Sequence, residues 1–324
     1  MSAAVYDVFN GDADGICALH QLRLNTPQPD SRLVTGVKRD IRLLRRLTDI
    51  EHASITVLDI SLDRNRDALL TLLERGNRIV YIDHHFSGDI PGHPNLEAHI
   101  DPAPQTCTSL IVDKLLGGRY RPWAVVGAFG DNLDEAAHEA ASSLNLTEDE
   151  LAQLRETGIL LNYNGYGAEL ADLFFPPDEL FRQVRQFTDP LTFYEESPAL
   201  RTLQQGYHED LARARKARPV LENESGRIFE LPAAPWSRRV AGVFANELAR
   251  QKKNLAHALI MPNEDGSLRI SVRAPLARRT GADLLCRQFP TGGGRAAAAG
   301  INQLPVTMRK QFLTAFTRQF SQES

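Results

Sequence analysis

Acidic and imidazole side chains follow three apolar runs in the first third of the chain. The runs are 5–9, 54–58 and 78–82, and the residues after them are Asp12 with Asp14, Asp59, and Asp83 with His84 and His85. If the runs are strands of an open parallel sheet, these residues lie at the carboxyl ends, where ligands collect. Oxygen donors with one or two imidazoles suit Mn²⁺ or Mg²⁺ better than Zn²⁺. The spacing therefore predicts a divalent metal site.

A simpler interpretation exists for each acid taken alone. A single Asp after a strand is most often a helix cap or a turn residue. That role does not explain three acid-bearing strand ends in one region, and no hydrophobic core requires the adjacent pair His84-His85. The metal site is therefore the better interpretation of the set.

The same residues resemble the motifs of the DHH phosphoesterase superfamily. The family has four motifs in a fixed order, and each has a counterpart here. The Asp-x-Asp-Gly turn resembles Asp12-Ala13-Asp14-Gly15, and the single acid after a strand resembles Asp59. The signature triplet resembles Asp83-His84-His85, and the Gly-Asp pair after an apolar helix resembles Gly130-Asp131. The resemblance covers nearly the whole chain. Because the order and the spacing of the motifs both fit, it is far more specific than any one motif.

This resemblance implies a phosphoesterase with two Mn²⁺ ions, for which Mg²⁺ or another divalent cation can substitute. Asp12 and Asp59 are then ligands of one ion, and the ligands of the other are Asp14, Asp59, His84 and Asp131. Asp83 supports the site, and His85 faces the scissile phosphate. Two such cations provide a hydroxide near neutral pH and neutralise the charge that builds on the phosphoryl oxygens.

The chain departs from the family's pattern at the first metal. Many relatives carry a His where this chain has Val8, and the exonuclease-like members carry an Asp where it has Asn10. Asn10 offers a neutral carbonyl oxygen and no charge. Whether the first metal position is filled without substrate therefore stays open, as does whether Lys38 and Arg39, after the second apolar run, reach the same crevice.

The C-terminal region resembles the DHH-associated domain. Its glycine triplet and small-residue run match 292–300, except that Arg295 stands where His is usual, and Ser271-Val272-Arg273 resembles a strand of the short-oligonucleotide members. The resemblance implies a substrate-binding role, with an anion-binding nest in a glycine-rich turn and bidentate arginines, for Arg273, Gly292, Gly293, Gly294 and Arg295. A flexible loop followed by a close-packed helix start is the alternative.

The apolar periodicity predicts the elements that must position these residues. Through about residue 120 strands alternate with helices, which indicates a parallel, right-handed α/β sheet with strands at 5–9, 32–37, 54–60 and 78–83. Helices are expected at 16–24, 40–49, 63–75, 106–117, 122–129 and 134–144. A further helix begins at Thr147, where Glu150 completes a capping box. Later strands are expected at 227–231, 255–261 and 268–273, with helices at 238–251, 281–287 and 307–320.

The expected fold class is therefore α/β with two domains. A parallel-sheet N-terminal DHH domain with a helical extension is expected at 1–195, a linker helix at 196–219 and a smaller α/β DHH-associated domain at 220–324. A chain of 324 residues suits two domains. The linker helix carries several basic residues and ends before Pro219.

Composition limits the class of protein. Hydrophobic content of 42% and charged content of 24% are ordinary for a soluble domain, and a net charge of −4 argues against a non-specific binder of long nucleic acid. The three cysteines are far apart and suggest neither disulfides nor a zinc knuckle. No apolar stretch reaches the ~18 residues of a membrane span, and no signal peptide is recognisable, so we expect a cytoplasmic protein without a membrane partner.

The compact two-domain plan resembles nanoRNases. It implies a Mn²⁺-dependent phosphodiesterase that cleaves linear dinucleotides, such as the pGpG of cyclic-di-GMP signalling or pApA, and very short oligonucleotides. Alternatives are phosphate removal from 3′-phosphoadenosine 5′-phosphate and opening of cyclic dinucleotides. A regulator without catalysis is favoured by Asn10 and Arg295 and disfavoured by the five acidic and imidazole ligands. Long duplexes are not expected partners, and base preference and homodimer formation stay open.

Overall fold

The computed structural model describes residues 3–321 and divides into two compact units. The first unit runs to Gln205 and the second begins at Gly206. Helix α9 (Pro198–Ala214) carries the chain from one unit into the other. It lies within the segment where the sequence predicts a helix, and it ends four residues before Arg218.

The first unit contains a five-stranded parallel sheet with the order β2-β1-β3-β4-β5. Its strands are β1 (Val5–Phe9), β2 (Arg32–Val34), β3 (Ser54–Leu58), β4 (Arg78–Asp83) and β5 (Leu96–Ile100). The predicted parallel α/β sheet is confirmed. The sequence did not predict β5, because this edge strand is only half buried and its segment shows no continuous apolar run.

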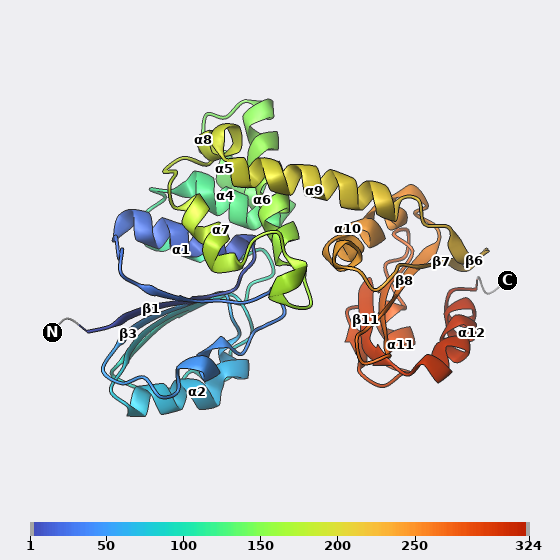
Figure 1. Cartoon of the computed structure of the whole chain (residues 1–324), viewed down its shortest axis with the longest axis horizontal. Coiled ribbons are helices and arrows are strands. Elements are labelled where there is room, and N and C mark those ends of the chain that lie inside the picture. Colours follow the sequence, from blue (N-terminus) through green and yellow to red (C-terminus); the bar gives the residue numbers. More distant parts are fainter. Residues whose placement is uncertain (1–2, 322–324) are drawn as a thin grey trace. The chain divides into compact units, whose positions relative to one another are not determined.

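Alternate residues of these strands face opposite layers, as the period of a strand requires. Helix α2 (Leu62–Glu74) and the short helix η1 (Leu43–Leu47) cover one face, where Val57 and Tyr81 belong to the buried core. Helix α1 (Ala13–Asn25) covers the other face, as Figure 1 shows. There Arg23 forms a buried ion pair with Asp7 and donates to Thr56 Oγ1 at 3.0 Å.

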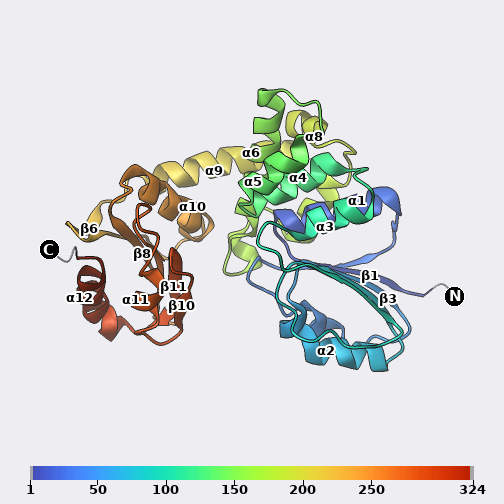
Figure 2. The same ribbon diagram turned by 180° about the vertical axis from the view of Figure 1, so that it is seen from behind.

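The helical part of this unit packs around α1. Helices α3 (Thr108–Leu115) and α4 (Arg121–Gly130) lie beside it (Figure 2). The other helices are α5 (Asp134–Ala141), α6 (Glu148–Gly165), η2 (Leu170–Asp172), α7 (Pro177–Val184) and α8 (Pro190–Glu196). The predicted capping box is confirmed, because Thr147 Oγ1 accepts from the Glu150 N–H at 3.2 Å and the Glu150 carboxylate accepts from the Thr147 N–H at 2.7 Å.

The second unit contains a mixed six-stranded sheet with the order β10-β11-β9-β8-β7-β6. Its strands are β6 (Pro219–Asn223), β7 (Gly226–Glu230), β8 (Ala256–Pro262), β9 (Leu268–Arg273), β10 (Gly292–Gly294) and β11 (Ala298–Leu304). Its helices are α10 (Pro235–Gln251), α11 (Ala282–Cys286), η3 (Val306–Met308) and α12 (Arg309–Phe320). The core includes Ile270, Phe312 and Phe316. The smaller α/β domain is therefore confirmed as a fold class.

None of the helices within residues 3–321 is long and apolar enough to cross a membrane.

Candidate metal centre

The carboxyl ends of three neighbouring strands bring the predicted acids into one cluster. Asp12 caps helix α1, and its Oδ1 accepts from the Gly15 N–H at 3.1 Å. Asp59 follows β3 and Asp83 is the last residue of β4; both are buried. Asp12 therefore has the helix-capping role that is common for a lone Asp, and it also belongs to the acidic cluster.

Asp59 has a left-handed backbone with φ of 57°. Residues other than glycine seldom adopt this conformation, and local strain of this kind often occurs at functional sites. The backbone N–H of Asp59 donates to the Ile82 carbonyl at 3.1 Å, and Thr108 Oγ1 donates to Asp59 Oδ1 at 3.3 Å. These contacts hold the carboxylate beside the end of β4.

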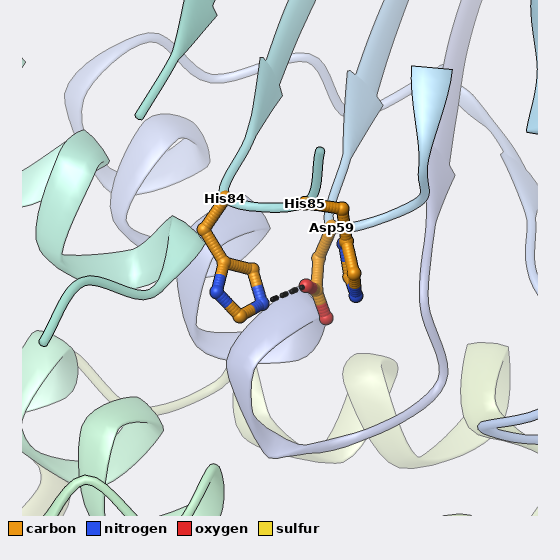
Figure 3. Close-up of side chains that lie close together, drawn as sticks. All are labelled: Asp59, His84 and His85. Atoms are coloured by element: carbon orange, nitrogen blue, oxygen red, sulfur yellow. Dashed lines mark ion pairs between the residues drawn. The ribbon is translucent and has the colours of Figure 1, made fainter. Parts of the chain in front are cut away.

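His84 is oriented as a metal ligand would be. Its Nδ1 lies 2.9 Å from the Thr106 carbonyl oxygen, which can only accept, so Nδ1 carries a proton and Nε2 is the ring atom that faces the carboxylates. Nε2 lies 3.4 Å from Asp59 Oδ1 and 3.8 Å from Asp131 Oδ2. Figure 3 shows the His84 ring pointing at the Asp59 carboxylate, with the His85 ring beside them.

His85 pairs with the acid of its own motif. Its Nδ1 lies 2.7 Å from Asp83 Oδ1, whereas Asp83 Oδ2 is buried without a hydrogen-bond partner. Burial alone would lower the pKa of His85, but the Asp83 carboxylate raises it above its ordinary value. The His85 side chain is 40% exposed, so it reaches the solvent side of the cluster. One ligand atom each from Asp59, His84 and His85 lie within 4.8 Å of one another.

Two glycines allow helix α4 to deliver Asp131. A Cβ on Gly127 would lie 2.1 Å from Ser109 Oγ, and one on Gly130 would lie 2.2 Å from the Ala13 Cβ. Any side chain there would push α4 away from α1 and α3. Asp131 caps the C-terminus of α4, and its N–H donates to the Gly127 carbonyl at 2.9 Å. The close helix packing therefore brings Asp131 to the strand ends.

Asp14 is held by the N-terminus of α3. Its Oδ2 accepts from the Thr108 N–H at 2.7 Å, and its Oδ1 accepts from the Ser109 N–H at 2.7 Å and the Ser109 hydroxyl at 2.5 Å. The free N–H groups and the dipole of a helix start favour an anion. The sequence analysis did not predict that Thr108 and Ser109 hold Asp14, although a polar pair before an apolar helix is a recognisable signal.

The electrostatics of the cluster favour a bound cation. Burial raises the pKa of Asp59 well above its usual range, and the negative charges of Asp12, Asp14 and Asp131 raise it further. A divalent cation would offset this repulsion and replace the water that the carboxylates have lost. Carboxylate oxygens with one imidazole nitrogen are a donor set of the kind that Mn²⁺ and Mg²⁺ accept. The residues present therefore fit a divalent metal ion.

Lys38 also reaches this cluster, which answers the question that its spacing left open. Its Nζ lies 2.6 Å from Asp12 Oδ2 and 3.3 Å from Asp131 Oδ1. Burial would lower the pKa of Lys38, but the charge of Asp12 outweighs it and the pKa is raised well above the ordinary value. Burial would raise the pKa of Asp12, and Lys38 with the Gly15 N–H holds it below the usual range instead.

The substrate-binding residues expected from the C-terminal motif lie together in the second unit. Gly292, Gly293 and Gly294 form strand β10 and pair with β11, so they do not form the expected glycine-rich turn. The turn comes next, where Arg295 and Ala298 exchange backbone hydrogen bonds of 2.9 and 3.1 Å. The alternative of a helix start is also wrong, because Ala298 begins β11.

Arg273 is close to this turn in the sheet. It is paired with Ala298 in the register of β9 and β11, and its Nε donates to Asn246 Oδ1 at 2.7 Å. Arg295 is exposed. The second unit thus brings a partly buried and an exposed guanidinium to one end of the same pair of strands.

Comparison with known proteins identifies the fold. No family model and no curated protein sequence matches the chain. A DHH domain from a member of a family of ribosomal proteins aligns over 98% of this chain and 86% of its own, at 14% identity and a TM-score of 0.61. The exonuclease RecJ bound to manganese aligns over 99% and 91%, at 15% identity and a TM-score of 0.61.

A third solved structure is a pGpG-specific phosphodiesterase from Vibrio cholerae. It aligns over 99% of this chain and 100% of its own, at 14% identity and a TM-score of 0.53. The chain therefore has the fold of DHH-domain proteins.

Proposed function

We propose that this chain, which has the fold of DHH-domain proteins, is a divalent-metal-dependent phosphodiesterase. Its proposed substrates are linear dinucleotides of the pGpG or pApA type and very short oligonucleotides, which it hydrolyses to mononucleotides. The observation that carries the proposal is the buried carboxylate cluster that faces Nε2 of His84. The proposed ligands of the ion on the Asp59 and His84 side are Asp14, Asp59, His84 and Asp131, and a second ion would require Asp12.

Mn²⁺ is the proposed metal. The RecJ structure with the same fold is bound to manganese, and the donor set here suits that ion. The sequence predicts two ions; the Asp59 and His84 side has the donors for one, whereas Lys38 contacts the Asp12 side. A divalent cation at such a site provides a Lewis acid for the phosphoryl oxygens and lowers the pKa of water to near neutral.

His85 is proposed as the catalytic group that contacts the phosphate. Asp83 holds its Nδ1, so its Nε2 is the atom that faces the substrate. Because Asp83 raises the pKa of His85, the protonated ring is favoured, and its Nε2–H donates to a phosphoryl oxygen. Asp83 acts through His85 by fixing the orientation and the charge of the ring.

An exposed aromatic ring beside the centre supports a nucleotide substrate. Phe86 follows His85 directly and is 75% exposed. Aromatic rings on which bases stack are a common means of binding single-stranded nucleic acid without sequence preference. We propose that a dinucleotide whose phosphate lies at His85 stacks one base on this ring, since Phe86 is the next residue in the chain.

Replacing Phe86 with alanine is expected to raise KM for dinucleotides roughly five- to 150-fold with little change in kcat, because base stacking contributes about 1–3 kcal/mol. Steady-state rates on pGpG and pApA measure the effect. Phe86→Leu keeps an apolar side chain and removes the ring, so it should resemble alanine, whereas Phe86→Tyr should resemble the wild type. Equal KM values for the leucine and wild-type proteins would contradict stacking.

The second unit is proposed to bind a terminal phosphate through Arg273 and Arg295. A hydrogen bond to a charged group contributes about 1.5–3 kcal/mol, which corresponds to roughly ten- to a hundred-fold in affinity. Each substrate molecule has one such terminal phosphate, so this binding contribution is the same for a short and a long strand. It is therefore a large share of the binding of a dinucleotide and a small share for a longer strand, which makes other contacts.

Arg295→Ala is expected to raise KM for a dinucleotide about ten-fold and to have a much smaller effect on a ten-nucleotide RNA. Arg295→Lys should recover only part of the loss, because lysine lacks the planar fork of donors. The exposed Arg250 on α10 provides the control, since Arg250→Ala removes an equal charge from the same unit. An equal loss on both substrates would contradict this role of Arg295, and so would a wild-type protein that prefers the longer RNA. Either result would favour an exonuclease that acts on longer strands.

A competition assay separates the proposed substrate from the alternatives. Unlabelled 3′-phosphoadenosine 5′-phosphate and cyclic dinucleotides are added to a Mn²⁺-supplemented reaction on labelled pGpG or pApA. Dinucleotide cleavage is expected to dominate. Binding of all nucleotides with hydrolysis of none would instead support the regulator without catalysis.

A further inference from the structure

The Lys38 ammonium is surrounded by oxygen atoms. Its Nζ lies 2.6 Å from Asp12 Oδ2, 3.3 Å from Asp131 Oδ1 and 3.2 Å from Asn162 Oδ1. An ammonium group has three N–H donors. Three acceptors from three separate elements therefore match its full donor capacity, at a side chain that is only 27% exposed.

The surrounding chain holds Lys38 in this position. Its backbone N–H donates to the Gly165 carbonyl at 3.0 Å, and its carbonyl accepts from Asn10 Nδ2 at 3.3 Å. The Tyr166 ring lies 5.6 Å from Nζ, and the Tyr166 hydroxyl contacts Asn162 Nδ2 at 2.7 Å. Since both the backbone and the head group have partners, this lysine has a defined place in the fold.

Strand β1 offers few metal donors on the Asp12 side. Val8 is apolar and buried. Asn10 turns its amide nitrogen to the Lys38 carbonyl, and its Oδ1, which is buried without a hydrogen-bond partner, is a neutral donor that brings no charge. Asp12 itself accepts from Gly15 through Oδ1 and contacts Lys38 through Oδ2. The Asp12 side thus has one carboxylate whose charge is already matched by a cation.

Asp131 connects the two sides of the cluster. Its Oδ1 faces Lys38, and its Oδ2 lies 3.8 Å from His84 Nε2. One carboxylate therefore faces a fixed cation through one oxygen and the proposed metal ligands through the other. Asp131 thus has the Lys38 ammonium on one side and the single proposed metal ion on the other, and a second metal ion is not needed to balance its charge.

We propose that the Lys38 ammonium takes the place of one of two divalent cations, so that this centre holds a single exchangeable metal ion on the Asp59 and His84 side. The proposal rests on the proposed function and deepens it. Lysine is a compact point charge, and its three donors are already held by Asp12, Asp131 and Asn162. Lys38 therefore supplies the positive charge of the missing cation to these side chains and acts as a positioning residue without contacting the substrate.

The number of bound ions tests the proposal without reference to activity. The purified full chain is freed of metal with a chelator and equilibrated with Mn²⁺; bound manganese is counted by mass spectrometry, and the spin state is read by electron paramagnetic resonance. The wild type is expected to bind one ion per chain with the hyperfine spectrum of an isolated Mn²⁺. Lys38→Met, which keeps the length of the side chain and removes the charge, is expected to bind two.

Two further variants keep the test decisive. Asp12→Asn in the presence of Lys38 should leave the count at one, and Asp12→Asn combined with Lys38→Met should return the count from two to one. Lys114→Met, at an exposed lysine of the same unit, is the matched control. If Lys38→Met does not fold, the Asp12→Asn count alone decides, because a metal ion on Asp12 would be lost.

A wild-type protein with two ions or an exchange-coupled spectrum overturns the proposal, and so does a second ion that enters only with a non-hydrolysable dinucleotide analogue. A count of one in folded Lys38→Met also overturns it. The proposed function can fail separately. If the protein binds one ion but hydrolyses no phosphodiester, the proposed phosphodiesterase activity is contradicted, whereas the role of Lys38 as a fixed cation is not.

Discussion

Replacing Asp59 is expected to abolish turnover and most metal uptake. Its carboxylate lies between the carboxyl ends of β3 and β4, beside His84 Nε2, and it is the most strongly repelled acid of the cluster. A metal ion relieves that repulsion, and removal of Asp59 takes away the ligand nearest to His84. The rate on a dinucleotide should fall to the background level, and bound Mn²⁺ should fall with it.

The choice of variant matters at this position because Asp59 has a left-handed backbone. Asparagine tolerates that conformation better than alanine does, so Asp59→Asn removes the charge with less strain. Bound manganese and the rate are measured on both variants. The metal-free Asp59→Asn protein should unfold at a temperature no lower than the metal-free wild type, because a buried, repelled charge is gone.

Near-normal activity in a well-folded Asp59→Asn or Asp59→Ala protein would contradict the metal assignment. Loss of activity with normal metal content would show that Asp59 acts on the substrate and is not a ligand.

The second large effect separates the two adjacent histidines. His84→Ala should lose metal, because Nε2 faces the carboxylates of Asp59 and Asp131. His85→Ala should keep metal content close to the wild type and reduce kcat by about a hundred- to ten-thousand-fold, the range typical of a positioned proton donor. Metal content and single-turnover rates on a dinucleotide measure both effects.

Asp83 gives an internal check on the role of His85. Asp83→Asn removes the negative charge that raises the pKa of His85, so the rate should decline at a lower pH than in the wild type, with metal content unchanged. The three ligand atoms of Asp59, His84 and His85 lie close enough together for one ion to bind all of them. If His85→Ala and His84→Ala lose metal equally, His85 is a ligand and the assignment of the two imidazoles is wrong.

Local patterns in the sequence determined the frame of the centre. Apolar runs with period two form strands wherever they are buried, and the residue that follows each run must lie at a strand end. Once β1, β3 and β4 pair in parallel, Asp12, Asp59 and Asp83 follow at the same end of the sheet. The capping box at Thr147 is equally local, because its contacts span only three residues.

The tertiary structure alone decided which other groups join the cluster. Lys38, Thr108 and Asn162 are far apart in the chain and carry no shared motif; helix packing through Gly127 and Gly130 and the return of α6 bring them within reach. Pairing across the second sheet likewise made the glycine triplet an edge strand. Spacing along the chain predicts which residues can follow a strand, whereas the charge that faces a given carboxylate depends on contacts between distant segments, and these form only when the core closes.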